Sequence, residues 1–410
     1  MIKKLKEVAK VNEISISSKS YPANIYYIDI ASVDNGFITA AQEIKFSEAP
    51  TRARRIVKNK DILLSTVRPN LRHYAFVQNA KDNTIASTGF AVISCKNINP
   101  RFLYYFLTSN NVTDYLSAIA ESHTSTYPSF PPEILEELEI PFPSEDEQEK
   151  IANILGTLDD KIELNRQMNQ TLEAMARAIF KSWFVDFDPV YAKMEGRDYP
   201  LPPETMDLFP DEMEESELGL IPKGWRVGTI GDIADNLKYV VHPNEVNEAT
   251  YYIGLEHMPR KNIALDTWDY SEKVTSNKYA FSKGNILFGK LRPYFHKVGI
   301  TPVDGICSTD IIVVNGKDND YQNFLLFLLS STVFVDSVSA ASTGTKMPRT
   351  DWKYMQSYEI PLPPEIILKK FNSIVKSMVE KIVLNIHTSK NLENFRDVLL
   401  PKLIKGELDL

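Results

Sequence analysis

The sequence predicts an α+β protein with a pseudo-two-fold internal duplication. Two α/β domains lie in tandem, and each is followed by a long helix. The first observation is a repeat with a shift of 220 residues, in which Ile140-Pro-Phe-Pro143 recurs as Ile360-Pro-Leu-Pro363. The second is a long amphipathic segment after each motif. The third is the length of 410 residues, enough for two or three domains of about 150 residues. The predicted parts are a first domain (1–143), a first long helix (144–182), an acidic, proline-rich linker (183–221), a second domain (222–363) and a second long helix (364–410).

The repeat extends into both predicted domains. Asp61–Pro69 resembles Asn285–Pro293, and Ser87-Thr88 matches Ser308-Thr309. Short runs rich in β-branched and aromatic residues predict strands in each half. Apolar segments that begin at Phe102 and Phe324 predict core helices. A period this long is not that of a solenoid, so the pattern indicates a duplicated domain.

The two long helices are predicted to pair as an antiparallel coiled coil. Ser144-Glu-Asp-Glu147 has the pattern of a capping box that begins the first helix. Seam residues then follow in steps of three and four. The residues assigned to the seam are Leu155, Leu158, Ile162, Asn165, Leu172 and Ile179 in the first helix and Val375, Met378, Ile382, Asn385, Leu392 and Leu399 in the second, with Asn169, Ala176, Ser389 and Arg396 at the intervening steps. Arg396 interrupts the seam, so fraying or a different contact is expected there. The alternative is that each helix packs on its own domain.

Charge is unevenly distributed along the chain. The formal net charge is −8, yet residues 183–221 alone carry 2 Lys and Arg against 11 Asp and Glu, together with five prolines. That segment opens with Trp183–Phe187, which is expected to pack, and otherwise reads as a solvated linker or a docking surface for a partner. Residues 1–130 hold 16 basic against 10 acidic residues, so the acidic total does not exclude a nucleic-acid partner.

Several classes of protein are excluded by composition and motif. Two cysteines do not support a disulfide scaffold or a Cys-rich zinc site. No phosphate-binding loop, dinucleotide-binding turn or HExxH pattern occurs, so no catalytic or metal-binding residues are predicted, and no cofactor is expected on this chain. No apolar stretch is long enough to span a membrane, and the N-terminus does not resemble a signal peptide. A cytoplasmic protein without a membrane partner is expected.

Matched basic and aromatic clusters predict a nucleic-acid-binding surface in each half. Arginine forks bind phosphates or guanine edges, whereas lysines mostly contact phosphates. The candidate residues are Arg52, Arg54, Arg55, Lys58, Arg68, Arg72, Tyr74, Lys290, Arg292, Tyr294, His296, Lys346 and Arg349. A merely solvated basic face is the alternative for each cluster, and Arg68-Pro69 and Arg292-Pro293 could instead fix a turn after a strand. The matched loops Thr124–Pro128 and Gly344–Pro348 are candidates for reading bases or for closing turns.

Several of these motifs resemble the type I restriction-modification specificity subunits. The resemblance is carried by Ile140–Pro143, Glu147-Gln148, Lys161–Asn165, Ala178–Pro189 and Leu399–Glu407. With the duplication, it covers essentially the whole chain. A departure is Lys369-Lys370, which stands where the first helix has Glu149-Lys150, so contacts of partners with the two helices are expected to be unequal.

The resemblance implies two target recognition domains, each reading one half of a bipartite, asymmetric site in double-stranded DNA, with the coiled coil as spacer. It also implies two copies of a modification subunit, which transfer a methyl group from S-adenosylmethionine to adenine N6, and a restriction subunit that is an ATP-driven motor and nuclease. This chain is then not itself an enzyme. The rival interpretations are a stand-alone DNA-binding regulator with two modules and a coiled-coil adaptor without a DNA role.

Overall fold

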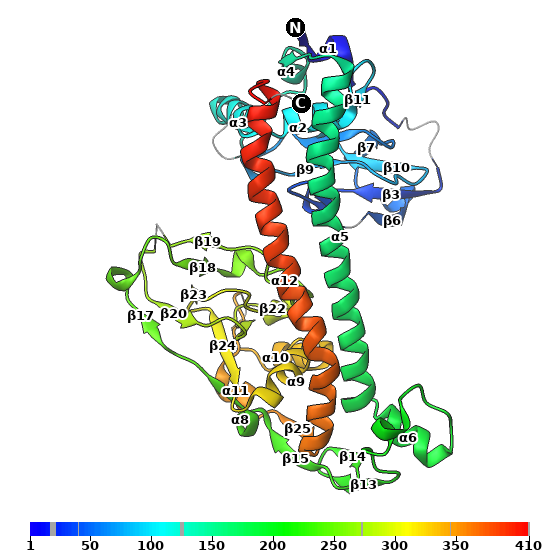
Figure 1. Ribbon diagram of the computed structural model, residues 1–410, viewed down its shortest axis with the longest axis vertical. Helices are drawn as coiled ribbons and strands as arrows, with labels where there is room; N and C mark the ends of the chain where they lie inside the picture. The colour runs from blue at the N-terminus through cyan, green and yellow to red at the C-terminus, as the bar shows by residue number, and fades with distance from the viewer. Residues whose placement is uncertain (17–21, 40, 124–126, 272–273, 345, 409–410) are drawn as a thin grey trace. The chain divides into compact units, whose positions relative to one another are not determined.

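The computed structural model describes residues 1–408 apart from 17–21, 40, 124–126, 272–273 and 345 (Figure 1). The chain divides into two compact units, Met1–Lys161 with Leu392–Leu410, and Ile162–Asn391. Each unit contains one α/β domain and part of both long helices, α5 (Glu145–Phe184) and α12 (Glu365–Ile404). This mixed α and β content, in two domains, is the predicted fold class.

The domain of the first unit is built on two four-stranded sheets, with strand orders β6-β3-β10-β7 and β2-β11-β8-β9. Its strands are β1 (Ile2–Lys4), β2 (Ala9–Val11), β3 (Asn24–Ile28), β4 (Val33–Asp34), β5 (Phe37–Ile38), β6 (Gln42–Lys45), β7 (Ala53–Ile56), β8 (Ile62–Ser65), β9 (Tyr74–Phe76), β10 (Thr84–Ser87), β11 (Phe90–Cys95) and β12 (Glu139–Pro141). Its helices are α1 (Leu5–Val8), α2 (Pro100–Leu107), α3 (Asn110–His123) and α4 (Glu133–Glu136).

The domain of the second unit repeats this plan. Its sheets have the orders β16-β24-β21-β22 and β17-β20-β23-β18-β19. Its strands are β15 (Arg226–Thr229), β16 (Ala234–Asn236), β17 (Val240–Val241), β18 (Tyr251–Ile253), β19 (Asp269–Tyr270), β20 (Lys278–Phe281), β21 (Ile286–Gly289), β22 (Val298–Ile300), β23 (Gly305–Ser308), β24 (Ile311–Gly316) and β25 (Glu359–Leu362). Its helices are α8 (Ile230–Ile233), α9 (Asn319–Leu329), α10 (Thr332–Ala340) and α11 (Trp352–Gln356).

Strand pairing shows the duplication directly. The antiparallel series β2-β11-β8-β9 corresponds to β16-β24-β21-β22, and each domain has one parallel pair, β3 with β10 and β18 with β23. In both domains the first strand pairs antiparallel with the last, β1 with β12 and β15 with β25. The two ends of each domain therefore lie side by side.

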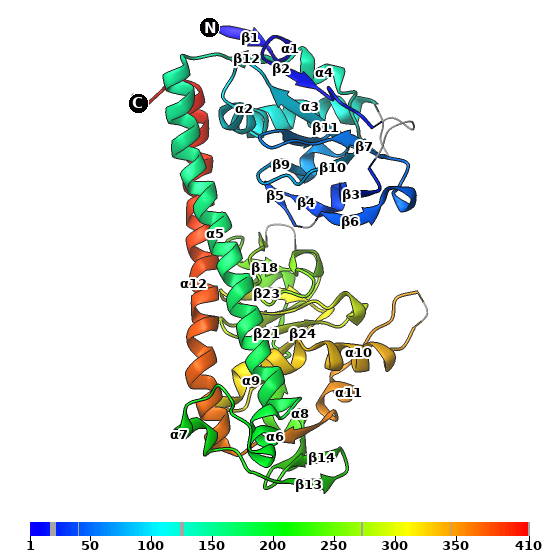
Figure 2. The same ribbon diagram turned by 90° about the vertical axis from the view of Figure 1, so that its right-hand side faces the viewer.

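Helices α2 and α9 form the inner layer against the sheets, as the apolar runs predicted (Figure 2). The Asn99 side chain caps α2 by accepting from the amides of Arg101 and Phe102, and Asp318 caps α9. Such side-chain oxygens satisfy amides that have no partner inside the helix. Phe102 and Phe324 are buried in the two cores, so each helix presents its apolar face to its sheet.

The long helices pair antiparallel in both units. In the second unit the Asn385 Nδ2 donates to Asn169 Oδ1 at 2.8 Å, and the Asn165 Nδ2 donates to Ser389 Oγ at 3.2 Å. Phe180 contacts Phe371 with ring centroids 6.2 Å apart. In the first unit Asp159 faces Arg396. As residue numbers rise along α5, those of their partners fall along α12. All twelve predicted seam residues are buried or half-buried.

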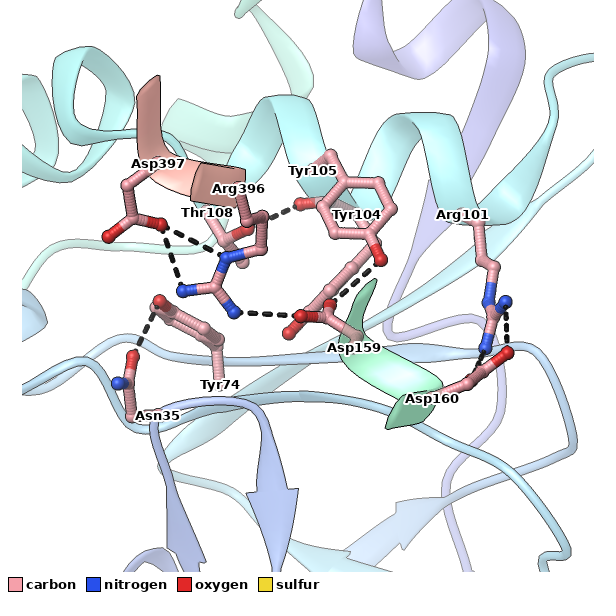
Figure 3. Close-up of polar contacts among 10 residues, drawn as sticks. All are labelled: Asn35, Tyr74, Arg101, Tyr104, Tyr105, Thr108, Asp159, Asp160, Arg396 and Asp397. Carbon is pink, nitrogen blue, oxygen red and sulfur yellow. Dashed lines mark hydrogen bonds and ion pairs between the residues drawn. The ribbon is translucent and has the colours of Figure 1, made fainter. Parts of the chain in front are cut away.

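Arg396 does not fray the end of α12 but enters a buried polar cluster (Figure 3). Its Nη1 lies 2.8 Å from Asp159 Oδ1, and only 16% of its side chain is exposed. The Tyr105 hydroxyl donates to Asp159 Oδ2 at 2.8 Å. Burial alone would lower the pKa of Arg396, but the carboxylates of Asp159 and Asp397 raise it overall. The guanidinium therefore stays charged and ties α12 to α5 and α2.

The segment 183–221 is folded rather than a free linker. It contains the end of α5, then α6 (Asp188–Glu195), α7 (Pro203–Met206) and the hairpin of β13 (Met213–Ser216) and β14 (Gly219–Pro222). Trp183 and Phe209 are buried and in edge contact at 5.1 Å. The expected solvation holds for the acidic side chains, since Asp211, Glu212, Glu214 and Glu215 are exposed. The apolar residues between the charges anchor the segment to the core of the second unit.

Replacing Arg396 by alanine is expected to destabilise the protein by roughly 2–3 kcal/mol, because the mostly buried Asp159 keeps the hydrogen bond from Tyr105 but loses the opposite charge of the guanidinium. The value lies at the low end for buried pairs, since the two side chains keep 16% and 22% exposure. Urea denaturation followed by circular dichroism measures it. Arg226→Ala, at a pair whose arginine is 63% exposed, is the matched control and should cost less than about 1 kcal/mol.

A double variant separates the ion pair from simple packing. Positions 396 and 159 correspond to Ala176 and Val379 after the 220-residue shift. Arg396→Ala combined with Asp159→Val copies that apolar pair and is expected to be more stable than Arg396→Ala alone. A double variant as unstable as the sum of the two single variants would contradict the role of the charge pair.

Candidate nucleic-acid interface

Two equivalent turns carry the arginine–proline motifs. Arg68 precedes the short 3-10 helix Pro69–Leu71, and Arg292 precedes Pro293–Phe295. The two arginines have φ of 48° and 50°, in the left-handed region that L-residues rarely adopt. Residues Arg72 and His296, which end the turns, have φ of 56° and 55°. A strained conformation repeated at four matched positions shows that this turn is a structural part of each domain.

In the first domain three loops meet at the turn and form what we call the first loop junction, residues 66–68, 88–89 and 127–128 with Arg52. The Arg68 amide donates to Pro128 O at 2.7 Å, the Thr66 amide to Gly89 O at 2.9 Å and the Thr88 amide to Arg52 O at 2.8 Å. The Arg68 guanidinium lies 5.0 Å from the centroid of the exposed Tyr127 ring. Of the predicted loop Thr124–Pro128, residues 124–126 lie outside the described residues.

The second domain has the corresponding second loop junction, residues 290–292, 309–310 and 346–350. The Lys290 amide donates to Asp310 O at 3.0 Å, and the Arg292 amide donates to Pro348 O at 2.7 Å. The Arg349 Nε donates to Asp310 Oδ1 at 3.2 Å. Lys346 and Arg349 are exposed. Within the predicted loop Gly344–Pro348, residue 345 lies outside the described residues.

Two candidate residues are buried, which corrects their assignment as DNA contacts. Tyr74 is 7% exposed, and its hydroxyl donates to Asn35 Oδ1 at 2.8 Å. Burial raises the pKa of Tyr74. His296 is 6% exposed, and its Nε2 lies 2.8 Å from Ser330 O. Tyr74 follows the strained turn and His296 ends it, and both side chains are buried within their domains, which does not support a direct contact with DNA.

Arg72 also turns inward. Its Nη2 donates to Asn110 Oδ1 at 2.8 Å, and the side chain lines a cavity of about 630 Å³ in the first unit. Tyr74, Tyr104, Arg396 and Asp397 line the same cavity (Figure 3). Groups of both charges surround this space, so Arg72 contributes to the interior rather than to a basic outer surface.

The remaining candidates lie beside the junctions or away from them. Arg54 and Arg55 are half-buried on β7, where Arg55 Nη1 donates to Ser15 Oγ at 3.1 Å. Lys58 is exposed beyond the end of that strand. Tyr294 is exposed within the second turn. The structure therefore gathers Arg52 and Arg68 at one junction and Lys290, Arg292, Lys346 and Arg349 at the other, with Tyr294 in the adjacent turn.

Asp310 belongs to the second junction but was not among the predicted residues, whereas Tyr127 lies in the predicted loop Thr124–Pro128. The repeat contained one signal for Asp310. Ser87-Thr88 matches Ser308-Thr309, and the residue that follows is Gly89 in the first half but the charged Asp310 in the second. Among the described residues, no group of three or more His, Cys, Asp or Glu side chains is arranged to hold a metal ion. No single helix in the described ranges is long and apolar enough to cross a membrane, and the consecutive pair α9 and α10 that together has the length is bent by 67°.

Protonation of the buried His296 predicts a pH effect on stability. Burial lowers the pKa of His296 in the folded state below its unfolded value of about 6.5. The unfolded chain then binds the proton more readily, so the neutral, buried His296 favours the folded state. This contribution to the free energy of unfolding is complete above about pH 7 and is lost as the pH falls through 6.5. Its slope is at most about 1.4 kcal/mol per pH unit.

The variant His296→Asn removes the titrating group and keeps a residue that tolerates positive φ. Between pH 7.5 and 5.5 its midpoint of thermal denaturation is expected to fall less than that of the wild type. His242→Asn, at an exposed position, is the control. Equal pH dependence of wild type and His296→Asn would show that His296 does not titrate in this way.

Comparison with known proteins agrees with this architecture. The family model described as "Type I restriction modification DNA specificity domain" matches residues 1–174 and 222–394. The HindI specificity subunit of Haemophilus influenzae is 30% identical over 442 aligned residues, covering 95% of each chain. The MjaIX specificity subunit of Methanocaldococcus jannaschii is 28% identical, covering 99% of this chain and 93% of that one. The S subunit of a type I restriction-modification system from M. genitalium has the same fold, with a TM-score of 0.53, 16% identity and coverage of 98% and 95%. The chain belongs to the family of type I restriction-modification specificity subunits.

Proposed function

We propose that this protein is the DNA-sequence-specificity subunit of a type I restriction-modification complex, with each domain reading one half of a bipartite site. The observation that carries the proposal is the loop junction, which occurs twice with one backbone and different side chains. Gly89 and Ser129 occupy the positions of Asp310 and Arg349. Two unlike reading surfaces fit an asymmetric site, because identical surfaces would select identical half-sites.

The paired helices supply the spacing between the half-sites in this proposal. From Leu155 to Ile179 the seam covers 24 residues, or about 36 Å at 1.5 Å per residue. This length is close to one turn of B-DNA, the separation at which two modules meet the same face of a duplex. The buried Asn165 and Asn385 support a fixed register, since a shifted pairing leaves their amides without partners.

In the same proposal the chemistry belongs to partner subunits. A modification subunit with S-adenosylmethionine methylates adenine N6, a restriction subunit with ATP translocates and cleaves DNA, and this chain remains non-catalytic in the cytoplasm. Matched exposed apolar residues on the long helices support two equivalent docking positions. Leu164 and Leu384 are 49% and 56% exposed, and Met175 and Phe395 are 48% and 55% exposed. The second residue of each pair follows the first by 220 positions.

The stand-alone regulator remains the alternative class of function, and the family membership favours the specificity subunit. The two differ in what the isolated chain does. A regulator binds its site tightly alone, whereas a specificity subunit directs methylation only in a complex.

Methylation mapping tests the proposed function. The full chain is co-expressed with a type I modification subunit in cells without adenine methylation, and methylated adenines are mapped across the genome. The expected result is one motif of two unlike half-sites separated by a fixed number of unspecified base pairs, with no methylation when either protein is expressed alone. Methylation by the isolated chain, or a single continuous motif, contradicts the proposal.

Substitutions at the proposed docking positions are predicted to change the number of modification subunits that the chain binds. Met175→Asp or Phe395→Asp places a charge on one of two apolar docking positions, which costs several kcal/mol if the residue is covered. Each single variant is expected to bind one modification subunit instead of two in native mass spectrometry, and the double variant none. Gln170→Asp, at an exposed polar position on α5, should still bind two. A double variant that retains two partners places the docking surface elsewhere.

A further inference from the structure

Arg349 and Asp310 form a partly exposed pair in the second loop junction that has no counterpart among the described residues of the first. We propose that Arg349, oriented by Asp310, reads a guanine in the half-site contacted by residues 222–363. This inference rests on the proposed function, because it requires that the second domain contacts duplex DNA. To the proposed function it adds guanine as the recognised base, Arg349 as the residue that recognises it and Asp310 as the residue that positions Arg349.

The backbone of Arg349 is held on both sides. Its amide donates to Thr343 O at 2.9 Å, and its carbonyl accepts from the Thr343 amide at 3.1 Å. Arg349 also forms a β-bridge with Leu291, next to the strained Arg292. The Arg292 Nη2 donates to Lys346 O at 3.3 Å and so fastens the same loop. A side chain on a fixed backbone has less conformational freedom to lose when it binds.

The Arg349 guanidinium is oriented but exposed. Its Nε lies 3.2 Å from Asp310 Oδ1, and the two side chains are 46% and 31% exposed. An ion pair at this exposure contributes little to stability, so its main effect is to fix the plane of the guanidinium. Among the described residues no other hydrogen bond or ion pair is recorded for this group. The edge with Nη1 and Nη2 is therefore available to a planar acceptor.

Guanine matches this edge better than the other bases. In the major groove it presents two acceptors, O6 and N7, to which an arginine fork donates two hydrogen bonds. Adenine presents N7 beside a donor, the N6 amino group, which repels one arm of the fork. A phosphate also accepts two hydrogen bonds, but the carboxylate of Asp310 would then lie close to a second negative charge. The paired carboxylate therefore favours a base edge over the DNA backbone.

The first domain lacks this device. The Thr66 amide donates to Gly89 O as the Lys290 amide donates to Asp310 O. Val67 forms a bridge with Ser129 as Leu291 does with Arg349. Gly89 and Ser129 thus occupy the places of the carboxylate and the arginine. The guanine preference is accordingly confined to one half-site, and Lys346, an exposed neighbour, is left for sequence-independent phosphate contacts.

The test uses the complex of the full chain with its modification subunits and three variants: Arg349→Lys, Asp310→Asn and the control Arg226→Lys. Arg226 is also an exposed arginine beside a carboxylate, 4.0 Å from Asp232, but it lies on β15, away from the junction. Methylation maps give the recognised motif of each variant. Binding is measured on the wild-type site and on the same site with 7-deazaguanine, which lacks N7, at each guanine in turn.

The expected result is a guanine in one half-site whose replacement by 7-deazaguanine weakens wild-type binding about ten- to a hundredfold, the discrimination that a bidentate arginine supplies. Arg349→Lys keeps one ammonium donor for guanine but lacks the planar fork, so it should tolerate other bases more readily at that position and reduce the 7-deazaguanine effect, while the other half-site stays unchanged. Asp310→Asn should relax the same position less strongly. Arg226→Lys should recognise the wild-type motif.

Several outcomes would overturn the inference. They are a wild-type motif without guanine in either half, an Arg349→Lys complex with unaltered discrimination, or a relaxed base in both halves. The proposed function fails separately, if the wild-type complex methylates no bipartite site. Thermal denaturation checks that each variant is folded, and a variant that loses recognition without losing stability supports the proposal.

Discussion

The antiparallel pairing of α5 with α12 is the constraint on which the rest of the structure depends. Its interior contains Asn165, Asn169, Asn385 and the ion pair of Arg396 with Asp159. Buried polar groups add little to stability over apolar residues, but they penalise pairings that leave them unmatched. A second copy of α12 in place of α5 would present Val379 to Arg396, because Val379 corresponds to Asp159 in the repeat. The charge would then be buried without a partner, so the polar residues select pairing of two unlike helices.

A second constraint acts where each domain presents its loops. Left-handed residues on both sides of the arginine–proline turn cost of order 1–3 kcal/mol each. They persist in both domains because backbone carbonyls of a neighbouring loop accept hydrogen bonds from the turn: Pro128 O accepts from the Arg68 amide, and Pro348 O accepts from the Arg292 amide. The shared backbone leaves the outward side chains to vary. The same turn therefore lies beside Arg68 and Tyr127 in the first domain and beside Arg349, held by Asp310, in the second.

Local periodicity explains which parts of the fold were predictable. The spacing of Leu155, Leu158 and Ile162 is visible in sequence because each turn of a helix repeats the same geometry. The structure begins the two long helices at Glu145 and Glu365, close to the predicted 144 and 364. The duplicated motifs likewise predicted two domains of one plan, and the family comparison confirms the predicted fold class.

The candidate site was less predictable, because burial depends on contacts distant in sequence. Nothing local distinguishes Tyr74 and His296, which point inward, from Arg68, which points outward. The acidic composition of residues 183–221 indicated a solvated linker, although the buried Trp183 and Phe209 pack against each other and hold the segment on the core of the second unit. Asp310 was not predictable from its neighbours in sequence, because its role depends on the contact with Arg349, 39 residues later.

The pairing of first and last strands in each domain has an evolutionary consequence. Since β1 lies against β12 and β15 against β25, the first and last strands of each domain are adjacent. Genetic exchange of the DNA that encodes the chain between those strands would substitute one domain for another and leave α5 and α12 intact. Under the proposed function, such an exchange would change the DNA sequence recognised in a single recombination event, while the pairing of α5 with α12 stays the same.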